Sequence, residues 1–186
     1  MIVTLETKRL ILRPWKEEDA ENLYELAKDE RVGPSAGWPP HKSVSESKEI
    51  IKSRFFEDIT FAVCKKETGE IMGCIGISLG KNSDLCASVE EAEIGYWIGF
   101  PYWGNGYIPE AAAELIRYCF EELKLQKIWC RYFDGNEKSK RVQEKCGFVY
   151  YRTVHGVPCN LLGELKTEHI SQLTLNEWRK THEKQN

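Results

Sequence analysis

The sequence predicts a mixed α/β (α+β) fold in which a mostly antiparallel central sheet carries helices on both faces. Short apolar runs typical of strands are interspersed with amphipathic segments typical of helices along the whole chain. Two of the strand-like runs, residues 60–65 and 71–79, are joined by the short glycine-containing sequence 67–70, which favours an antiparallel hairpin.

The first half of the chain begins with a predicted strand at residues 9–14. A helix at residues 16–28 follows, because acidic residues occupy its first turn and Ala20, Leu23 and Ala27 recur at helical spacing. Residues 33–41 contain three prolines and two glycines and are predicted to lack regular structure. A further helix is predicted from Ser45, before the hairpin.

The second half alternates between strands and helices. Strands are predicted at residues 92–98 and 127–133, with a long amphipathic helix at 109–124 between them. A short helix at residues 136–145 is expected to end at Gly147. The last predicted strands lie at residues 148–154 and 165–175.

The most informative pattern occupies residues 93–110. An apolar strand is followed by glycines at positions 99, 104 and 106, and Pro109 and Glu110 are predicted to open the long helix. Glycines before a helix allow backbone N–H groups to approach a ligand, and the helix dipole favours an anion there. The pattern therefore predicts a phosphate-binding loop of the kind that holds coenzyme A.

Length and charge limit the other function classes. A chain of 186 residues predicts one domain, spanning residues 1–186, and the net charge of −3 argues against a general nucleic-acid binder. The sequence has no run of 18 apolar residues and no N-terminal signal pattern, so we expect a cytoplasmic protein without membrane association.

The seven cysteines are scattered and form no Cys-x-x-Cys pair, which favours free thiols over disulfides. The nearest approach to a metal-binding set is Cys146, His155, Cys159 and His169. Its spacing matches no zinc pattern, so no metal site is predicted.

Several short motifs together resemble one family. They are the segments 7–14, 93–97, 102–107, 110–111, 136–139 and 147–148. Through these motifs the chain resembles the GNAT-superfamily N-acetyltransferases, specifically the branch related to ribosomal-protein N-terminal acetyltransferases of the RimJ/RimL type. The resemblance covers nearly the whole chain and implies a GNAT-like acyl-CoA N-acyltransferase fold.

The resemblance also implies a reaction, the direct transfer of acetyl from acetyl-CoA to a primary amine at a protein N-terminus or on a small molecule. It implies that the pantetheine arm lies along one strand and the pyrophosphate on the loop from Trp103 to Ile108. The implied coenzyme-binding residues are Tyr96, Trp97, Ile98, Trp103, Gly104, Asn105, Gly106, Tyr107, Ile108, Asn136 and Ser139.

The loop departs from the superfamily pattern at Trp103 and Ile108. Neither departure removes a backbone N–H, whereas Pro109 has none and cannot be a donor. Many superfamily members carry a tyrosine acid seven residues after the asparagine of the short helix, a position that Gln143 occupies here. In the resembling branch a serine three residues after that asparagine is the proposed acid, and Ser139 matches it.

The candidate general base is Glu93, because it precedes the strand expected to hold the thioester. A polar residue on an exposed strand face is the alternative explanation for Glu93, and a simple helix cap is the alternative for Asn136. A non-catalytic acyl-CoA-binding or regulatory module on the same fold is the alternative function. A nicotinamide-dinucleotide enzyme is disfavoured, since Pro109 stands where a third glycine is needed. The oligomeric state stays open, with a homodimer among the options.

Overall fold

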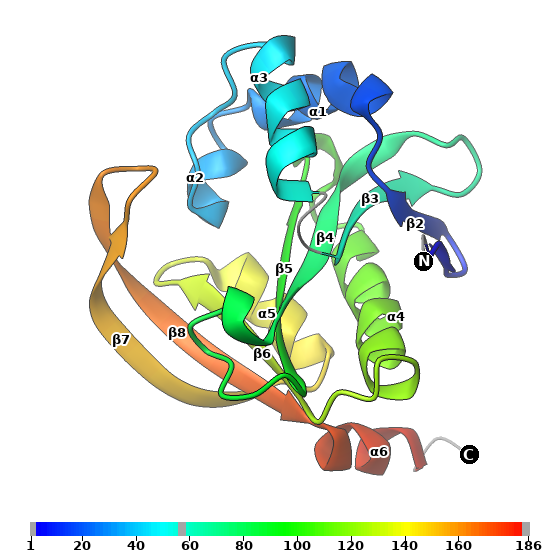
Figure 1. Cartoon of the computed structure of the whole chain (residues 1–186), viewed down its shortest axis with the longest axis vertical. Helices are drawn as coiled ribbons and strands as arrows, with labels where there is room; N and C mark the ends of the chain where they lie inside the picture. Colours follow the sequence, from blue (N-terminus) through cyan, green and yellow to red (C-terminus); the bar gives the residue numbers. More distant parts are fainter. Residues whose placement is uncertain (1–2, 56–58, 184–186) are drawn as a thin grey trace.

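The computed structural model describes residues 3–55 and 59–183, and the strands in these ranges form one eight-stranded sheet (Figure 1). The strands are β1 (Leu5–Glu6), β2 (Leu10–Pro14), β3 (Ile59–Lys65), β4 (Ile71–Leu79), β5 (Glu91–Ile98), β6 (Lys127–Phe133), β7 (Val149–Cys159) and β8 (Glu164–Thr174). Their order across the sheet is β1-β2-β3-β4-β5-β6-β8-β7. Only β5 and β6 pair in parallel, which confirms the predicted mostly antiparallel sheet.

Helices cover both faces of this sheet, as predicted. They are α1 (Ala20–Ala27), α2 (Gly33–Ala36), α3 (Val44–Ile50), α4 (Tyr107–Glu121), α5 (Glu137–Lys145) and α6 (Leu175–Glu183). Alternate residues of a strand point to opposite faces. On β3, Phe61 and Val63 therefore join the core beneath α4, whereas Ala62 and Cys64 pack with the residues of α1 on the other face.

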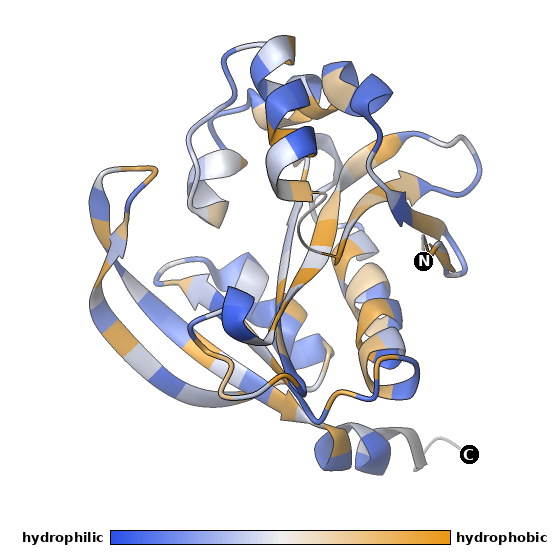
Figure 2. Cartoon of the chain, in the orientation of Figure 1, coloured by the Kyte–Doolittle hydropathy of each residue, from blue (hydrophilic) through white to orange (hydrophobic). Residues whose placement is uncertain are grey.

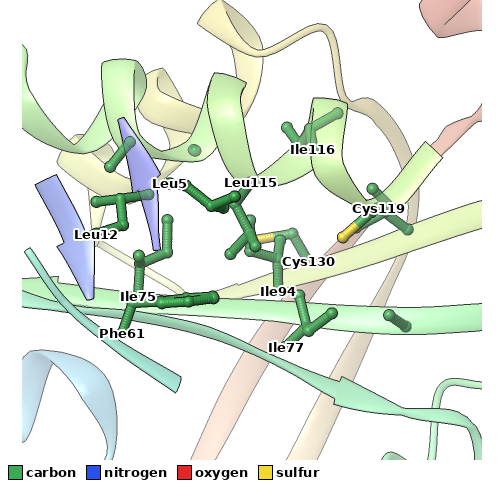
Figure 3. Packing of buried hydrophobic residues seen from close by; sticks show 14 of the residues in the cluster. Leu5, Leu12, Phe61, Ile75, Ile77, Ile94, Leu115, Ile116, Cys119 and Cys130 are labelled. Atoms are coloured by element: carbon green, nitrogen blue, oxygen red, sulfur yellow. The ribbon is translucent and has the colours of Figure 1, made fainter. Parts of the chain in front are cut away.

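The larger core lies between the sheet and α4. Figure 3 shows Leu115 and Cys119 of α4 on the side of the helix that faces the strand residues Ile75 and Ile94, and all four side chains are at most 2% exposed. Figure 2 shows β3 and β4 as largely hydrophobic, whereas β7 and β8 carry many hydrophilic residues. The apolar surface on which α4 is fixed comes from the strands β1 to β6 and from Leu173 of β8.

Two local predictions were wrong in detail. Residues 33–36 form the one-turn helix α2, which has Pro34 in its first turn and Gly37 in the left-handed region (φ 93°) as its C-cap. Helix α4 begins at Tyr107 instead of Pro109, with Gly106 as its N-cap. Pro109 is thus the third helical residue, where its missing N–H is still harmless because the first-turn amides have no acceptor within the helix.

The feature that positions the site is a split in the sheet. The parallel pairing of β5 with β6 extends only from Glu91–Lys127 to Glu93–Trp129. β5 nevertheless continues to Ile98, paired with β4 alone. From Ile94 onward, the edge of β5 that faces β6 is therefore not paired with a strand, and a gap opens between the two central strands.

The described cysteines are all free thiols, as the sequence predicted. Within residues 3–55 and 59–183, we find no helix with the length and apolar character needed to cross a bilayer.

Candidate active site

The glycine loop lies between β5 and α4, and its two glycines adopt a conformation that other residues reach only with strain. Gly104 has φ 77° and Gly106 has φ 75°, both in the left-handed region. No atom lies within 4 Å of the place that a Cβ would take at Gly104, and at Gly106 only Arg9 does, at 3.6 Å. The loop therefore presents open backbone to its surroundings.

The backbone N–H groups of this loop are available to a ligand. In the described part of the chain, no hydrogen bond uses the amides of Gly104, Asn105, Gly106, Tyr107 or Ile108. These amides stand at the N-terminus of a 15-residue helix, where the helix dipole adds a partial positive charge. The arrangement suits a phosphate or pyrophosphate group.

Side chains hold the loop in this shape. Trp103 Nε1 donates to the Ile98 carbonyl at 2.8 Å, and Asn105 Nδ2 donates to the Tyr102 and Trp103 carbonyls at 3.1 Å. Arg9 Nη1 donates to the Asn105 carbonyl at 3.1 Å. The conformation of the loop is thus fixed without using its own free amides.

Two cations lie beside the loop. Arg9 forms an ion pair with Glu110 at 2.6 Å and its guanidinium lies 4.6 Å from the centre of the Tyr107 ring. Lys138 Nζ lies 3.5 Å from the centre of the Trp103 ring. Both charges favour an anion at the loop. Sequence reasoning included Arg9 in a family motif but gave it no role, because its contact with Glu110 spans 101 residues.

Across the split, β5 contacts the first turn of α5. The Tyr96 hydroxyl lies 3.0 Å from Ser139 Oγ and donates to the Ser139 carbonyl at 3.2 Å. The Ser139 amide donates to Asn136 Oδ1 at 3.1 Å, so Asn136 is the N-cap of α5. Asn136 Nδ2 also donates to the Ser35 carbonyl at 3.2 Å and so links α5 to α2. The structure therefore brings Tyr96, Asn136 and Ser139 together.

Gln143 lies one turn beyond Ser139 on the same helix. Its side chain is 2% exposed, and neither its amide nitrogen nor its amide oxygen has a hydrogen-bond partner among the described residues. The Gln143 amide lies near the Tyr96 hydroxyl but outside hydrogen-bond geometry. Burial raises the pKa of Tyr96, and the nearby Gln143 amide lowers it by a smaller amount. A buried amide without partners costs about 1–3 kcal/mol.

The residues present fit acetyl-CoA. The loop amides suit its pyrophosphate, the edge of β5 from Ile94 to Tyr96, which is not paired with a strand, suits the amides of its pantetheine arm, and Gln143 offers an unused donor and acceptor. Trp97 faces the other side of the sheet, where its ring packs against Trp38 with 5.5 Å between ring centroids. Its backbone pairs with Cys74 of β4, so Trp97 does not present its side chain or its backbone groups to the split.

The predicted base Glu93 lies at the closed end of the split, in an ion pair. Its carboxylate accepts from Arg131 Nε at 2.6 Å and Nη2 at 2.8 Å, and from Ser83 Oγ at 2.6 Å. Arg131 also contacts Glu168 at 3.0 Å and Asp84 at 2.5 Å. We refer to Arg131, Glu93, Asp84 and Glu168 as the Arg131 cluster.

The charges of this cluster do not balance. Burial acts to lower the pKa of Arg131, but the hydrogen bond and charge of Glu93, with help from Asp84 and Glu168, raise it on balance. One guanidinium therefore faces three carboxylates, an excess of negative charge that attracts a cation such as a protonated amine. The role of Glu93 as a base stays a prediction, and sequence reasoning gave no role to Arg131 or Glu168.

The histidines and cysteines considered for metal binding have other partners. His155 and His169 contact Thr167 and Thr153 through Nδ1, at 3.1 and 2.8 Å. Cys159 Sγ lies 3.3 Å from the Gly37 carbonyl. Among the described residues no group of three or more His, Cys, Asp or Glu side chains could hold a metal ion.

Comparison with known proteins agrees with this geometry. Residues 9–149 match the family model described as an acetyltransferase (GNAT) domain. The N-acetyltransferase YoaA of Bacillus subtilis is 30% identical over 153 residues, which cover 80% of this chain and 84% of YoaA.

Two solved structures share the fold. One is the microcin C7 self-immunity acetyltransferase MccE in complex with acetyl-CoA and AMP, with a TM-score of 0.76 and 19% identity over 91% of this chain and 94% of that one. The other is the ribosomal-protein-S5-alanine acetyltransferase of Vibrio fischeri, with a TM-score of 0.74 and 22% identity over 95% of this chain and 98% of that one.

Proposed function

We infer, because the chain belongs to the GNAT family of acetyltransferases, that its acceptor is a primary amine whose pKa lies near neutrality, as at a protein N-terminus or on a small amine of similar basicity. The chain is an acetyl-CoA-dependent acyltransferase. Acetyl-CoA supplies the activated acetyl group. Membership of the family does not identify the amine that accepts it.

The observation that carries this proposal is the state of Glu93. Both of its oxygens accept hydrogen bonds from Arg131, and one also accepts from Ser83. Both oxygens of Glu93 are therefore already engaged by donors, so an amine proton can reach this carboxylate only by displacing one of these hydrogen bonds. It suits an acceptor that is already partly neutral at physiological pH.

The two common amine types differ strongly in this respect. An α-amino group has a pKa of about 7.7–8.0, so its neutral form costs about 1 kcal/mol at pH 7. A lysine side chain, with a pKa of about 10.4, requires between about 4 and 5 kcal/mol. The Arg131 cluster can draw in the protonated amine by its negative charge, and because both oxygens of Glu93 are already hydrogen-bonded, the site favours the α-amino group, which needs the least help to lose its proton.

The proposed roles follow the geometry. The amides of residues 104–108 hold the pyrophosphate, and the free edge of β5 holds the pantetheine arm. Glu93 takes the proton that the amine nitrogen loses as its bond to the acetyl carbon forms. Ser139 gives its hydroxyl proton to the sulfur as the carbon–sulfur bond breaks, and it regains a proton from water as Glu93 releases to water the proton it took from the amine. The acetyl group therefore passes directly to the amine, without a covalent intermediate on the protein.

The name of the Vibrio fischeri structure gives ribosomal protein S5 as that enzyme's acceptor, so a protein terminus is the first acceptor to test. The purified chain is incubated with acetyl-CoA and one of three acceptors. These are a lysine-free peptide with a free N-terminal alanine or serine, the same peptide with a blocked N-terminus and one lysine, and spermidine. Thiol release gives the rate, and mass spectrometry locates the acetyl group.

We expect the free-N-terminus peptide to be acetylated about 300-fold faster than the blocked lysine peptide, as the difference in amine pKa predicts. Faster acetylation of the lysine peptide would overturn the proposed acceptor class, and so would transfer to spermidine alone. Binding of coenzyme A without thiol release for any acceptor would favour a non-catalytic binding module on this fold.

A further inference from the structure

The hydroxyl of Tyr96 has one proton but lies within reach of two oxygens of Ser139. Ser139 Oγ lies 3.0 Å from it and the Ser139 carbonyl oxygen 3.2 Å. The carbonyl can only accept a hydrogen bond, whereas Oγ can accept or donate. The direction of the Tyr96 proton therefore decides what Ser139 Oγ can do.

Two arrangements follow. If Tyr96 donates to the carbonyl, the Ser139 hydroxyl donates to Tyr96 and its proton is turned away from the split. If Tyr96 donates to Oγ, the Ser139 proton is free to point at a sulfur atom in the split. In the second arrangement Oγ also becomes a stronger donor, because a hydroxyl that accepts a hydrogen bond is polarised by it.

Tyr96 is suited to orient Ser139 and not to supply the proton itself. Burial raises the pKa of Tyr96, so its phenol stays neutral. Its other close polar neighbours are the Cys130 thiol, whose pKa burial also raises, and the Gln143 amide, which does not titrate. Among the described residues these neighbours offer no path by which a proton lost from Tyr96 would be replaced.

The rest of the first turn of α5 is held independently of Tyr96. The Ser139 amide is bonded to Asn136 Oδ1 at 3.1 Å, and Asn136 is in turn bonded to the Ser35 carbonyl at 3.2 Å. The backbone of Ser139 is thus fixed by the helix cap. The cap does not fix the rotation of the Ser139 hydroxyl group. The side chain that contacts this hydroxyl is Tyr96.

We propose that Tyr96 is a positioning residue for the reaction, whose hydroxyl directs the Ser139 proton toward the departing sulfur. This role rests on the proposed function of Ser139 and goes beyond the backbone contact that the family resemblance implies for Tyr96. It predicts that the oxygen of Tyr96 matters only while Ser139 keeps its hydroxyl.

The test is a double-mutant cycle with Tyr96→Phe, Ser139→Ala and the combined variant. Each is assayed with acetyl-CoA and the alanine- or serine-initiated peptide named above, and Tyr118→Phe on α4 serves as the matched control. Tyr96→Phe keeps the ring and the backbone, so coenzyme A should bind as before. Thermal unfolding identifies any variant that has lost its fold.

We expect Tyr96→Phe to lower kcat about tenfold, the effect of one hydrogen bond worth about 1.4 kcal/mol in the transition state. The KM for acetyl-CoA should stay within about twofold of the wild type. In the Ser139→Ala background the same change should have no further effect. An equal tenfold loss in both backgrounds, or wild-type kcat for Tyr96→Phe, would overturn the proposal.

The failure of the underlying function gives a different result. If Ser139→Ala has wild-type kcat, the assignment of Ser139 as the acid fails, whatever Tyr96→Phe does. A readout independent of turnover completes the test. Crystal structures of the wild type and Tyr96→Phe should show one Ser139 rotamer in the former and several in the latter, with equal calorimetric affinities for coenzyme A. The same single rotamer in both would contradict the positioning role.

Discussion

The glycine loop and the Arg131 cluster lie at opposite ends of the split between β5 and β6, and they are built in different ways. The loop offers five backbone amides from consecutive residues, 104–108, and none of them has a partner within the described chain. The cluster is made of side chains from β5, β6, β8 and the connection before β5, and its carboxylates all contact Arg131.

The difference shows how each end can be used. Backbone donors are held in place by the fold. They can therefore bind a phosphate group of a common cosubstrate whatever the neighbouring side chains are. In a cluster of mutually paired charges, the position and electrostatic environment of each side chain depend on all the others. A substitution of one member therefore changes the environment of the rest. We expect the loop to be tolerant and the cluster to be sensitive, and the following predictions test this contrast, beginning with the largest expected effect.

Glu93→Gln should lower kcat about 100-fold, because a general base is lost while the size of the side chain is kept. The matched control is Glu168→Gln, which removes another carboxylate that bonds Arg131. Both variants are assayed for thiol release with the free-N-terminus peptide. If Glu168→Gln loses more activity than Glu93→Gln, the base is Glu168, and equal activity of both with the wild type would leave the cluster without a catalytic role.

Arg131→Met should lower the free energy of unfolding by about 2 kcal/mol, since it leaves the carboxylates of Glu93 and Glu168, which are largely buried, without their shared partner. This is less than for a fully buried pair because the Arg131 side chain is 22% exposed. Urea titration of the variant and the wild type measures the difference. Lys81→Met, on the connection before β5, is the control, and an equal loss of stability there would contradict the role of the cluster.

Gly106→Val should weaken coenzyme A binding about tenfold, because a β-branched residue is strained by about 1–2 kcal/mol in the left-handed conformation at φ 75°. Gly106→Asn is the control, since asparagine tolerates this conformation. Isothermal calorimetry with coenzyme A distinguishes them. If Asn is as harmful as Val, the loop depends on the absence of a side chain instead of on its backbone conformation.

Glu110→Gln should cost about 1 kcal/mol of stability at pH 7, because Glu110 accepts hydrogen bonds from Thr7 and Arg9. Burial acts to raise the pKa of Glu110, but these hydrogen bonds lower it below the usual 4.5 on balance. The stabilisation is therefore complete above about pH 4.5 and is lost as the pH falls through the lower folded-state pKa. Urea unfolding of both proteins at pH 7 and pH 3 should show a smaller difference at pH 3 than at pH 7.

The features predictable from the sequence are those determined locally. The hairpin of β3 and β4 follows from two apolar runs and a turn, and the start of α5 follows from Asn136 with Ser139 three residues later. The glycine loop is also a local pattern. Helix α2 was missed because prolines normally end regular structure, yet Pro34 is tolerated in a first helical turn.

The unpredicted features depend on contacts that are distant in sequence. Tyr96 reaches Ser139 across 43 residues, and Arg131 reaches Glu93 and Glu168 across 38 and 37. Nothing in the local sequence of Arg131 distinguishes it from an exposed strand residue. The register of β5, β6 and β8 determines which carboxylates Arg131 contacts. A shift of one residue would turn the Arg131 side chain to the other face of the sheet.

The short pairing of β5 with β6 has a mechanical consequence. In the described part of the chain, the strand pairing that joins the two halves of the sheet is limited to three residue pairs, from Glu91–Lys127 to Glu93–Trp129. A coenzyme bound in the split would contact both halves of the sheet and hold them together. By mass action it would add about 2.7 kcal/mol to stability at a concentration 100 times its Kd. Amide protons of β5 beyond Glu93 should then exchange with solvent more slowly, so the cosubstrate is expected to stiffen the sheet where β5 and β6 separate.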